Sequence, residues 1–432
     1  DVYKRQAIDP AAPEKSEIIV RLHDTDDPMP PEDADKQLTA AERDILTSWV
    51  KAGGKYAKHW AFVPPKKIAI DSGNAIDVLI ERQLKAKGHK FAPSAAPAIL
   101  ARRAALVLTG LPPEPALLKR FLADKKADAY ERLVDALLAG PHYGEHQARY
   151  WLDAVRYGDT HGLHLDNKRA IYPYRDWVVN AFNRNQPLNE FLTWQLAGDL
   201  LSEEPTLAQQ VATGFVRMNP TTAEGGAIPA EFQAKNNFDR VETLGTALLG
   251  MSLTCARCHT HKYDPIPSQD YYRLLSAFTT TIRGEVTTRA PWHDVDQKVL
   301  VTSEGLPKLK HHADGRGFPH FYKQIFFLSR GDVHQKHGAA ETGYLQVLIR
   351  PGSQLSRWQV KPPQGWTRTS FRRASLSRWM TDTRDGAGNL VARVIVNRLW
   401  HHHFGRGLVA TPNDFGTQGE AVSYTHLTLP TI

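Results

Sequence analysis

The chain has 432 residues, of which 41% are hydrophobic and 23% are charged, a composition typical of a globular protein and not of a disordered one. This length predicts about three domains at roughly 150 residues each. No apolar run approaches the ~18 residues of a membrane-spanning helix, which excludes such a segment in this sequence. The net charge is +8.

The two ends of the chain are related at the level of DNA. One coding of residues 1–6 has a reverse complement that encodes residues 422–426. Residues 1–6 and 422–432 therefore resemble a translated sequencing adapter, read on opposite strands. We expect the natural chain to run from about residue 7 to about residue 421, as a fragment of a larger multidomain protein whose signal peptide was lost with the start.

Residues 7–55 are typical of the end of a small helical domain. Thr39 and Glu42 form the pattern of a capping box, and apolar residues follow at helical spacing up to Gly53. Ahead of this helix, Met29 lies in a proline-rich loop. A methionine most often fills a gap in a core, but its thioether is also a ligand of haem iron.

Residues 56–75 read as a linker, because prolines and charges dominate them. Residues 76–283 are predicted to be a mainly helical domain, with apolar stripes that end near Gly88, Gly110 and Gly140. In this domain, we expect Asp153 and Arg156 to pair across one helical turn. With Asp159 and His161 they could form a polar site, although a salt-bridged helix end is the more ordinary interpretation.

Both cysteines of the chain lie in one C-x-x-C-H motif, which is the attachment signature of c-type haem. The thiols of Cys255 and Cys258 can reach the two vinyl groups of one porphyrin, and His259 can bind the iron as the proximal ligand. Two alternatives stay open. An oxidising compartment would permit a disulfide between the cysteines. A metal could instead bind them together with His261 and Asp264, although four ligands within ten residues strain a tetrahedral site.

The motif does not identify a distal haem ligand. His161, His164 and Met251 are weak candidates, since packing or surface exposure is the usual role of such residues. Three consecutive histidines at 401–403 would point about 100° apart on a helix, so we interpret them as a helix end and not as a metal site.

Residues 284–369 are predicted to be a small β-containing insert, with strands at 326–328 and 344–349. Between 301 and 375 there are twelve Lys or Arg against four Asp or Glu, a net charge of +8. This segment could bind an anionic polysaccharide, although a solvated basic face is the more common explanation. No nucleic-acid motif accompanies the charge. Residues 370–421 return to helix, most clearly at 390–400.

Several motifs together resemble planctomycete cytochrome c-like proteins. The junction at 59–65 (HWAFVPP) is similar to the one that follows their cytochrome c-like domain. Their central domain of unknown function is similar at LTGLPP (108–113), PHYGE (141–145), YPYRDW (172–177), QLAGDLL (195–201) and CARCHTHKYDP (255–265). The start of their C-terminal domain of unknown function is similar at VIVNR (394–398), HFGRGLV (403–409) and NDFG (413–416).

The resemblance implies an exported bacterial protein of the periplasm or cell envelope, with a truncated cytochrome c-like domain at 7–55. It implies that Met29 is the distal ligand of that domain's haem, whose own attachment motif would lie upstream. Members often carry Asp directly after the motif histidine, where this chain has Thr260.

We therefore expect a mainly α protein that carries covalent haem c on Cys255, Cys258 and His259. Its expected role is electron transfer or redox chemistry with a redox partner protein, linked to polysaccharide degradation. The alternative is a non-redox carbohydrate-binding or hydrolytic scaffold in which Cys255 and Cys258 form a disulfide. The sequence does not decide whether the protein is an enzyme.

Overall fold

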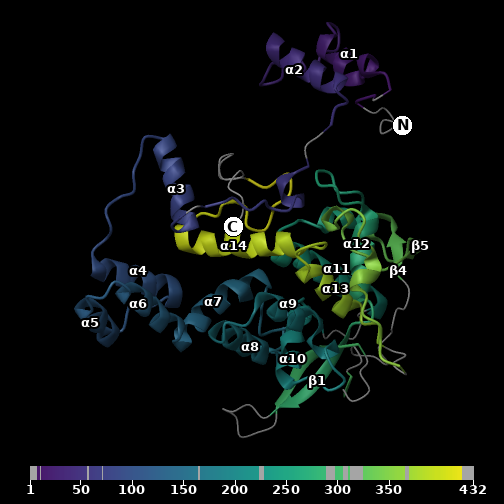
Figure 1. Ribbon diagram of the computed structural model, residues 1–432. Coiled ribbons are helices and arrows are strands. Elements are labelled where there is room, and N and C mark those ends of the chain that lie inside the picture. Colours follow the sequence, from purple (N-terminus) through teal and green to yellow (C-terminus); the bar gives the residue numbers. More distant parts are fainter. Residues whose placement is uncertain are drawn as a thin grey trace. The chain divides into compact units, whose positions relative to one another are not determined.

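Figure 1 shows the computed structural model of the chain. The structure describes residues 7–9, 11–55, 58–70, 72–163, 166–222, 228–288, 297–304, 310–311, 325–364 and 369–420. Contacts divide the chain into two units, Asp1–His59 and Trp60–Ile432, which we describe separately. In the described residues helices predominate and strands form only two small sheets, which confirms the mainly α prediction. None of the described helices is long and apolar enough to cross a membrane.

The first unit is built on two helices, α1 (Glu17–His23) and α2 (Ala40–Lys51), with a short 3-10 turn at Pro13–Lys15. The predicted capping box is present: the Thr39 hydroxyl accepts the Glu42 N–H at 3.3 Å, and the Glu42 carboxylate accepts the Thr39 N–H at 2.8 Å. These bonds satisfy two helix-end donors and fix where α2 begins.

The second unit opens with a 3-10 turn, Trp60–Phe62 (η3). Four helices follow: α3 (Ala75–Ala86), α4 (Pro97–Thr109), α5 (Pro115–Ala123) and α6 (Ala129–Leu138). Gly110 ends α4 in the left-handed conformation, with φ 71°. Helices α4 and α6 share a small core of their own, and α4 also packs on the next helix, α7. The helices predicted from the three apolar stripes are thus confirmed.

A large part of the main core comes from α7 (Pro141–Ala154), α8 (Tyr172–Asn183), α9 (Leu188–Ala197), α10 (Leu207–Ala212) and α11 (Pro229–Leu244), and later elements complete it. Helices α7 and α8 approach closely at Gly144, where a Cβ would overlap the carbonyl oxygen of Val179. Trp177 of α8 stacks on Phe191 of α9, with ring centroids 5.2 Å apart. Large rings and a small residue at the closest approach together give this helix cluster dense packing.

Two small antiparallel sheets follow α12 (Ser268–Leu275). One sheet has the order β2–β1–β3, with β1 at Ile282–Thr288, β2 at Gln297–Ser303 and β3 at Lys310–His311. The other pairs β4 (Ile325–Leu328) with β5 (Lys336–Ala340), which confirms the strand predicted at 326–328. In β2, Val299 and Val301 enter the core while Lys298 is exposed, the alternation expected of a half-buried strand.

The strand predicted at 344–349 is wrong. The segment contains a 3-10 turn, Gln346–Leu348 (η10), and the adjacent residues Tyr344 and Leu345 are both buried. Two buried neighbours do not fit the alternating faces of a strand. The first N–H of the turn donates to Asp270 Oδ2 at 2.8 Å instead of to a neighbouring strand. A short apolar run does not by itself distinguish these structures.

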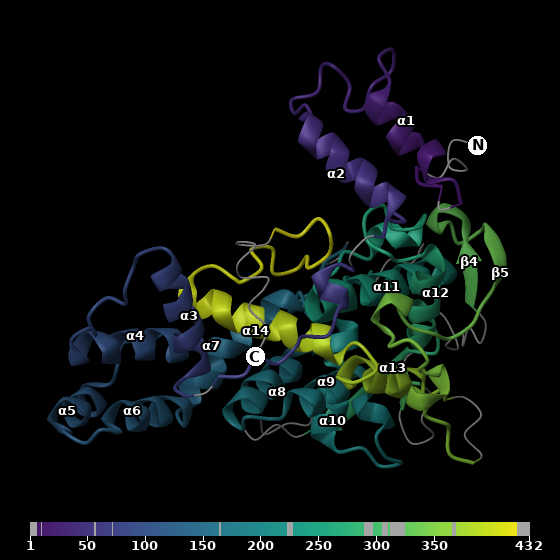
Figure 2. The same cartoon turned by 45° about the horizontal axis from the view of Figure 1, so that its top comes forward.

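The chain closes with a 3-10 turn, Leu355–Trp358 (η11), and two helices, α13 (Arg372–Thr381) and α14 (Gly388–Phe404). Helix α14 includes the stretch predicted to be helical at 390–400 and ends just after the three histidines, as predicted. It lies against the π-helical turn Gly245–Leu249 (η6), where Arg398 donates to the carbonyl oxygens of Thr246 and Ala247. Figure 2 shows α14, in yellow, extending from α3 toward α13.

Candidate functional site

The C-x-x-C-H motif lies on a single turn that follows η6. Residues Thr254–Arg257 form a 3-10 helix (η7), and the N–H groups of Cys258 and His259 both donate to the Cys255 carbonyl, at 3.2 and 3.4 Å. Both thiols are free and exposed. The backbone thus brings the three predicted haem-attachment residues onto one turn, and neither sulfur is already bonded to another.

The tautomer of His259 follows from its neighbour. The exposed imidazole places Nδ1 2.7 Å from the carbonyl oxygen of Thr260. A carbonyl oxygen only accepts, so Nδ1 carries the proton and donates it. The lone pair is then on Nε2, which is the arrangement found where a histidine binds a metal and its second nitrogen donates to a backbone carbonyl.

The second thiol lies in a polar contact between two parts of the chain. Cys258 Sγ donates to the Arg330 carbonyl at 3.3 Å, from the turn between β4 and β5. Beside it, Arg257 Nη1 pairs with Glu242 Oε1 at 3.2 Å. Burial acts to lower the pKa of Arg257, but Glu242, Tyr271 and Cys258 stabilise its charge and the pKa is raised overall. The Arg257 guanidinium is therefore held beside the Cys258 sulfur.

The turn is anchored to the core behind it. The hydroxyl of Tyr272, on α12, donates to the Arg257 carbonyl at 2.7 Å, and the Arg257 guanidinium lies 5.1 Å from the Phe238 ring centroid. Ala256, between the cysteines, is fully buried. One side of the turn is therefore fixed while the side with the thiols faces solvent.

His261 and Asp264, considered above as metal ligands together with the two cysteines, instead make hydrogen bonds within the protein. His261 Nδ1 accepts the Asp264 N–H at 2.9 Å, which shapes the loop. Asp264 Oδ1 accepts the N–H and the hydroxyl of Thr417, at 2.8 and 3.1 Å. The described residues contain no group of three or more His, Cys, Asp or Glu side chains that could hold a metal ion. The pair instead fastens the motif loop to the C-terminal segment.

The candidates for a distal haem ligand differ in how they are placed. Met251 is fully buried in the main core, where its side chain packs among apolar residues. His161 Nδ1 lies 2.6 Å from Thr221 Oγ1, and burial lowers the pKa of this histidine. His164 lies outside the described residues.

Met29, the predicted distal ligand of the first unit, is 47% exposed. Its N–H donates to the Arg21 carbonyl at 2.9 Å, which ties the proline-rich loop to α1. The side chain therefore does not fill a core gap, and its ligand role stays a prediction.

The segment after α7 carries a salt bridge, in line with the preferred interpretation of a salt-bridged helix end, but with a different partner from the one expected. Helix α7 ends at Ala154, and Arg156 turns away with φ 60°. Its guanidinium makes two bonds to Asp239 of α11, at 2.5 and 2.7 Å, so the expected pair with Asp153 is wrong. Asp159 accepts from Tyr157 at 2.5 Å. The tertiary contact with α11 takes the place of the local pairing.

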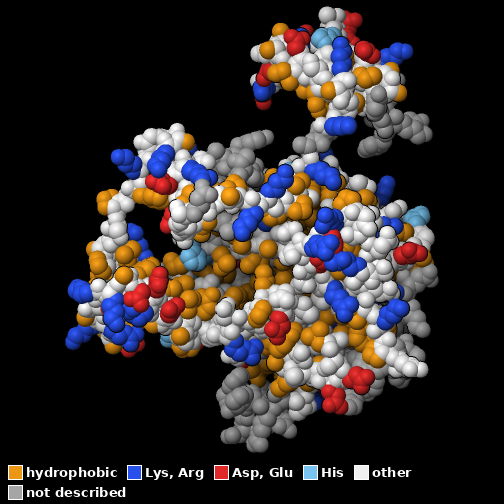
Figure 3. All heavy atoms as spheres, in the orientation of Figure 1, with side chains coloured by type: hydrophobic (Ala, Val, Ile, Leu, Met, Phe, Trp, Pro, Cys, Tyr) orange, Lys and Arg blue, Asp and Glu red, His pale blue; other side chains and the backbone are white. Residues whose placement is uncertain are grey.

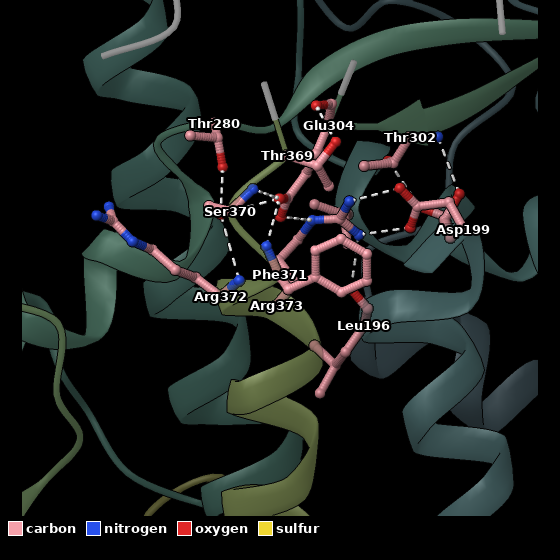
Figure 4. A network of polar contacts seen from close by, with 12 residues as sticks. Leu196, Asp199, Thr280, Thr302, Glu304, Thr369, Ser370, Phe371, Arg372 and Arg373 are labelled. Carbon is pink, nitrogen blue, oxygen red and sulfur yellow. Dashed lines mark hydrogen bonds and ion pairs between the residues drawn. The ribbon is translucent and has the colours of Figure 1, made fainter. Parts of the chain in front are cut away.

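A buried ionic cluster is the main polar feature that the sequence did not reveal (Figure 4). Arg373, at the start of α13, is fully buried and donates to Asp199 Oδ1 and Oδ2 at 2.8 and 2.6 Å and to the Leu196 carbonyl at 2.8 Å. Its Nε forms an ion pair with Glu304 Oε1 at 3.2 Å, outside hydrogen-bond geometry. Burial raises the pKa of Asp199, although Arg373 opposes this.

The second carboxylate of this cluster also organises the start of α13. Glu304 Oε2 accepts the N–H groups of Ser370 and Phe371 at 2.9 and 3.1 Å, together with the Ser370 hydroxyl at 2.9 Å. The cluster thus joins α9, the end of β2 and α13, three segments far apart in the sequence.

The excess of basic residues at 301–375 is only partly a surface feature. Arg357 pairs with Asp382 and Asp385, both at 3.1 Å, while Arg373 is buried. On the face drawn in Figure 3, Lys and Arg side chains are interspersed with Asp and Glu. The sequence count therefore overstates the exposed positive charge.

Two parts of this helical chain are similar to known families. Residues 75–283 match PSCyt2, described as a protein of unknown function (DUF1549), and residues 372–428 match PSD1, described as a protein of unknown function (DUF1553). Both are planctomycete-associated, cytochrome c-like domain families, so the resemblance seen in the motifs is confirmed at this level. No curated protein and no solved structure matches the chain.

Proposed function

We propose that this chain is an exported c-type haem protein that serves electron transfer or redox chemistry, with haem carried by Cys255, Cys258 and His259. The observation that supports this most directly is the η7 turn, which presents two free, exposed thiols and an imidazole whose Nε2 bears the lone pair. Haem bound there would supply an iron that changes oxidation state.

The residues of the turn fit this role. Each thiol would add across one vinyl group, so that sulfur gains a bond to carbon and its proton goes to the neighbouring carbon. Cys258 would give up its contact with the Arg330 carbonyl on attachment. The Thr260 carbonyl would keep His259 in the required tautomer and orientation, as such acceptors do for metal-binding histidines.

Location and partners follow from the same proposal. Covalent haem attachment implies the periplasm or cell envelope, and electron transfer implies a redox partner protein. Met29 would be the distal ligand of a second haem in the first unit, where its exposed thioether is accessible. A link to polysaccharide degradation would add an anionic polysaccharide as a second partner.

One observation favours the alternative, a scaffold with a disulfide. Both thiols are free and exposed, and they lie three positions apart on the same turn, as in the C-x-x-C pairs of thiol–disulfide chemistry. In that case the two cysteines would bond to each other, and the protein would bind or hydrolyse carbohydrate without redox chemistry.

Intact mass spectrometry of the chain, produced in a periplasm with haem-attachment machinery, separates these outcomes. We expect a gain of one haem, together with haem staining that survives denaturation. The matched variant Cys255→Ser, Cys258→Ser should gain nothing, and His259→Ala should change the absorption spectrum of any haem still attached.

A loss of two hydrogens without haem would mean a disulfide and would support the alternative. An unmodified mass in that host would contradict both.

A further inference from the structure

The last turn of α14 carries the three consecutive histidines and meets α7 through an aromatic contact. The His402 imidazole stacks on the Tyr150 ring, with ring centroids 3.5 Å apart and planes 20° apart. Figures 1 and 2 both show α14 beside α7. Tyr150 lies in the region that matches PSCyt2, and His402 lies in the region that matches PSD1. The stack is therefore a direct contact between the two matched regions.

A second imidazole, that of His146, supports the Tyr150 ring from within α7. His146 is only 9% exposed, and its Nδ1 lies 2.9 Å from Arg149 Nη2, which can only donate. Nδ1 is therefore unprotonated, and Nε2 carries the proton, which it donates to Tyr150 Oη at 3.2 Å. A second proton on His146 would remove the acceptor that Arg149 uses and would place two cations in contact. This hydrogen-bond geometry thus requires a neutral His146.

The end of α4 packs against the same imidazole. A Cβ at Gly110, which ends α4, would lie 2.3 Å from His146 Nδ1. Gln147, the next residue of α7, donates to the carbonyl oxygens of Val107 and Leu108, both at 3.4 Å. The end of α4 thus closes one side of His146, where a counter-ion could otherwise stabilise a charged ring.

The charged groups that act most on the two imidazoles are cations. Burial lowers the pKa of His146, and Arg149 adds to this effect. Burial also lowers the pKa of His402, and the groups that add to this effect are His401, His403, His146 and Arg398. None of these groups is a carboxylate. Protonation of either ring would therefore add positive charge to a basic environment.

The Tyr150 ring does not remove this repulsion. An aromatic face attracts a cation, but the Arg149 guanidinium already lies 5.2 Å from the Tyr150 centroid. A protonated His402 would therefore add a second cation to the same ring. His146 meets Tyr150 with the two rings at 86°, and gains no stacking in compensation.

We infer that the contact of His402 with Tyr150 and His146 is pH-sensitive, and that it releases the end of α14 from α7 as the pH falls from about 7.5 to about 5.5. A histidine whose pKa is lowered in the contact binds fewer protons there than in the released state. The contact is therefore stable above the ordinary histidine pKa of about 6.5 and weakens as the pH falls below it. This device is separate from the C-x-x-C-H turn and does not depend on haem.

Hydrogen exchange of the full chain, followed by mass spectrometry at pH 7.5 and 5.5, tests the inference. The Gly405 N–H donates to the His401 carbonyl at 2.8 Å and reports on the last turn of α14. After correction for the intrinsic effect of pH on exchange, protection of residues 401–405 should fall about tenfold or more at pH 5.5, since one pKa unit corresponds to a factor of about ten. Protection of α8, in the main core, should not change.

Two substitutions replace the imidazoles by neutral groups of similar shape. In His146→Gln the amide oxygen can accept from Arg149 and the amide N–H can donate to Tyr150, and in His402→Phe the ring can still stack. The double variant should keep its protection at pH 5.5. His142→Gln is the matched control, because His142 is an exposed histidine of α7 that pairs with Glu145 Oε2 at 2.7 Å, and it should lose protection as the unmodified chain does.

Each single variant should reduce the loss of protection, so either one decides the matter if the double variant fails to fold. Equal protection of 401–405 at both pH values in the unmodified chain would overturn the inference. So would a loss that persists undiminished without the two imidazoles, or one that His142→Gln abolishes. An equal loss in α8 would also overturn it, because the acid would then unfold the whole unit.

Discussion

Replacing Arg373 with methionine tests whether the buried cluster holds the second unit together. The side chain is fully buried, with three hydrogen bonds of 2.6–2.8 Å and an ion pair of 3.2 Å to Glu304. Arg373→Met leaves the carboxylates of Asp199 and Glu304 buried without their cation. Breaking a buried ion pair in this way costs about 3–5 kcal/mol, a large share of the ~5–15 kcal/mol that stabilises a typical domain.

Guanidinium unfolding followed by tryptophan fluorescence measures this loss, since Trp379 lies buried on the same helix. Arg378→Met is the matched control, because it changes an exposed arginine of α13 and should alter the free energy of unfolding by less than about 0.5 kcal/mol. A cost below about 1 kcal/mol for Arg373→Met would refute the reasoning.

The pH dependence supplies a second check. Burial already raises the pKa of Asp199, and removing Arg373 takes away the group that opposes this. The folded variant would then bind protons that the unfolded chain, with a carboxyl pKa of about 3.9, does not bind. The variant should therefore become more stable as the pH falls from 8 to 5, and the cost of Arg373→Met should shrink. A cost that does not change with pH would contradict this account.

Two further substitutions test packing and charge elsewhere. Gly144→Ala should lower the free energy of unfolding by about 1–3 kcal/mol in thermal melts, because the new methyl group overlaps the Val179 carbonyl, while Gly158→Ala, with open space around it, should not. Partial burial acts against ionisation of Asp382, but hydrogen bonds from an indole N–H and two backbone N–H groups lower its pKa overall. Its stabilisation is present above pH ~4 and lost below it, so Asp382→Asn should show a smaller loss of stability between pH 6 and 3 in denaturant titrations.

Local patterns were sufficient for much of the fold. Apolar stripes and glycine stops predicted α3, α4 and α6, because these signals act within a few residues. The C-x-x-C-H turn was found in the same way, since its three residues are neighbours in the chain. The sequence thus located the candidate site and most helices around it.

The errors and omissions depend on contacts between distant residues. Arg156 was expected to pair with Asp153, but α7 ends too early and α11 supplies Asp239 instead. The cluster around Arg373 joins residues more than 60 positions apart, and no spacing in the sequence marks it. Pairing of this kind is set by tertiary packing, which local periodicity does not encode.

The contact between the motif loop and the C-terminal segment bears on how the two matched families can be studied. Thr417 bonds to Asp264 of the loop, and the N–H of Phe415 donates to the Gly250 carbonyl at 2.6 Å, just ahead of η7. A recombinant piece that stops at residue 283 would lose these contacts, together with those that Arg398 makes to η6. Haem loading measured on such a piece would therefore describe an η7 turn that has lost part of its support, and not the turn of the full chain. The regions that match PSCyt2 and PSD1 are therefore best expressed and assayed together in one chain.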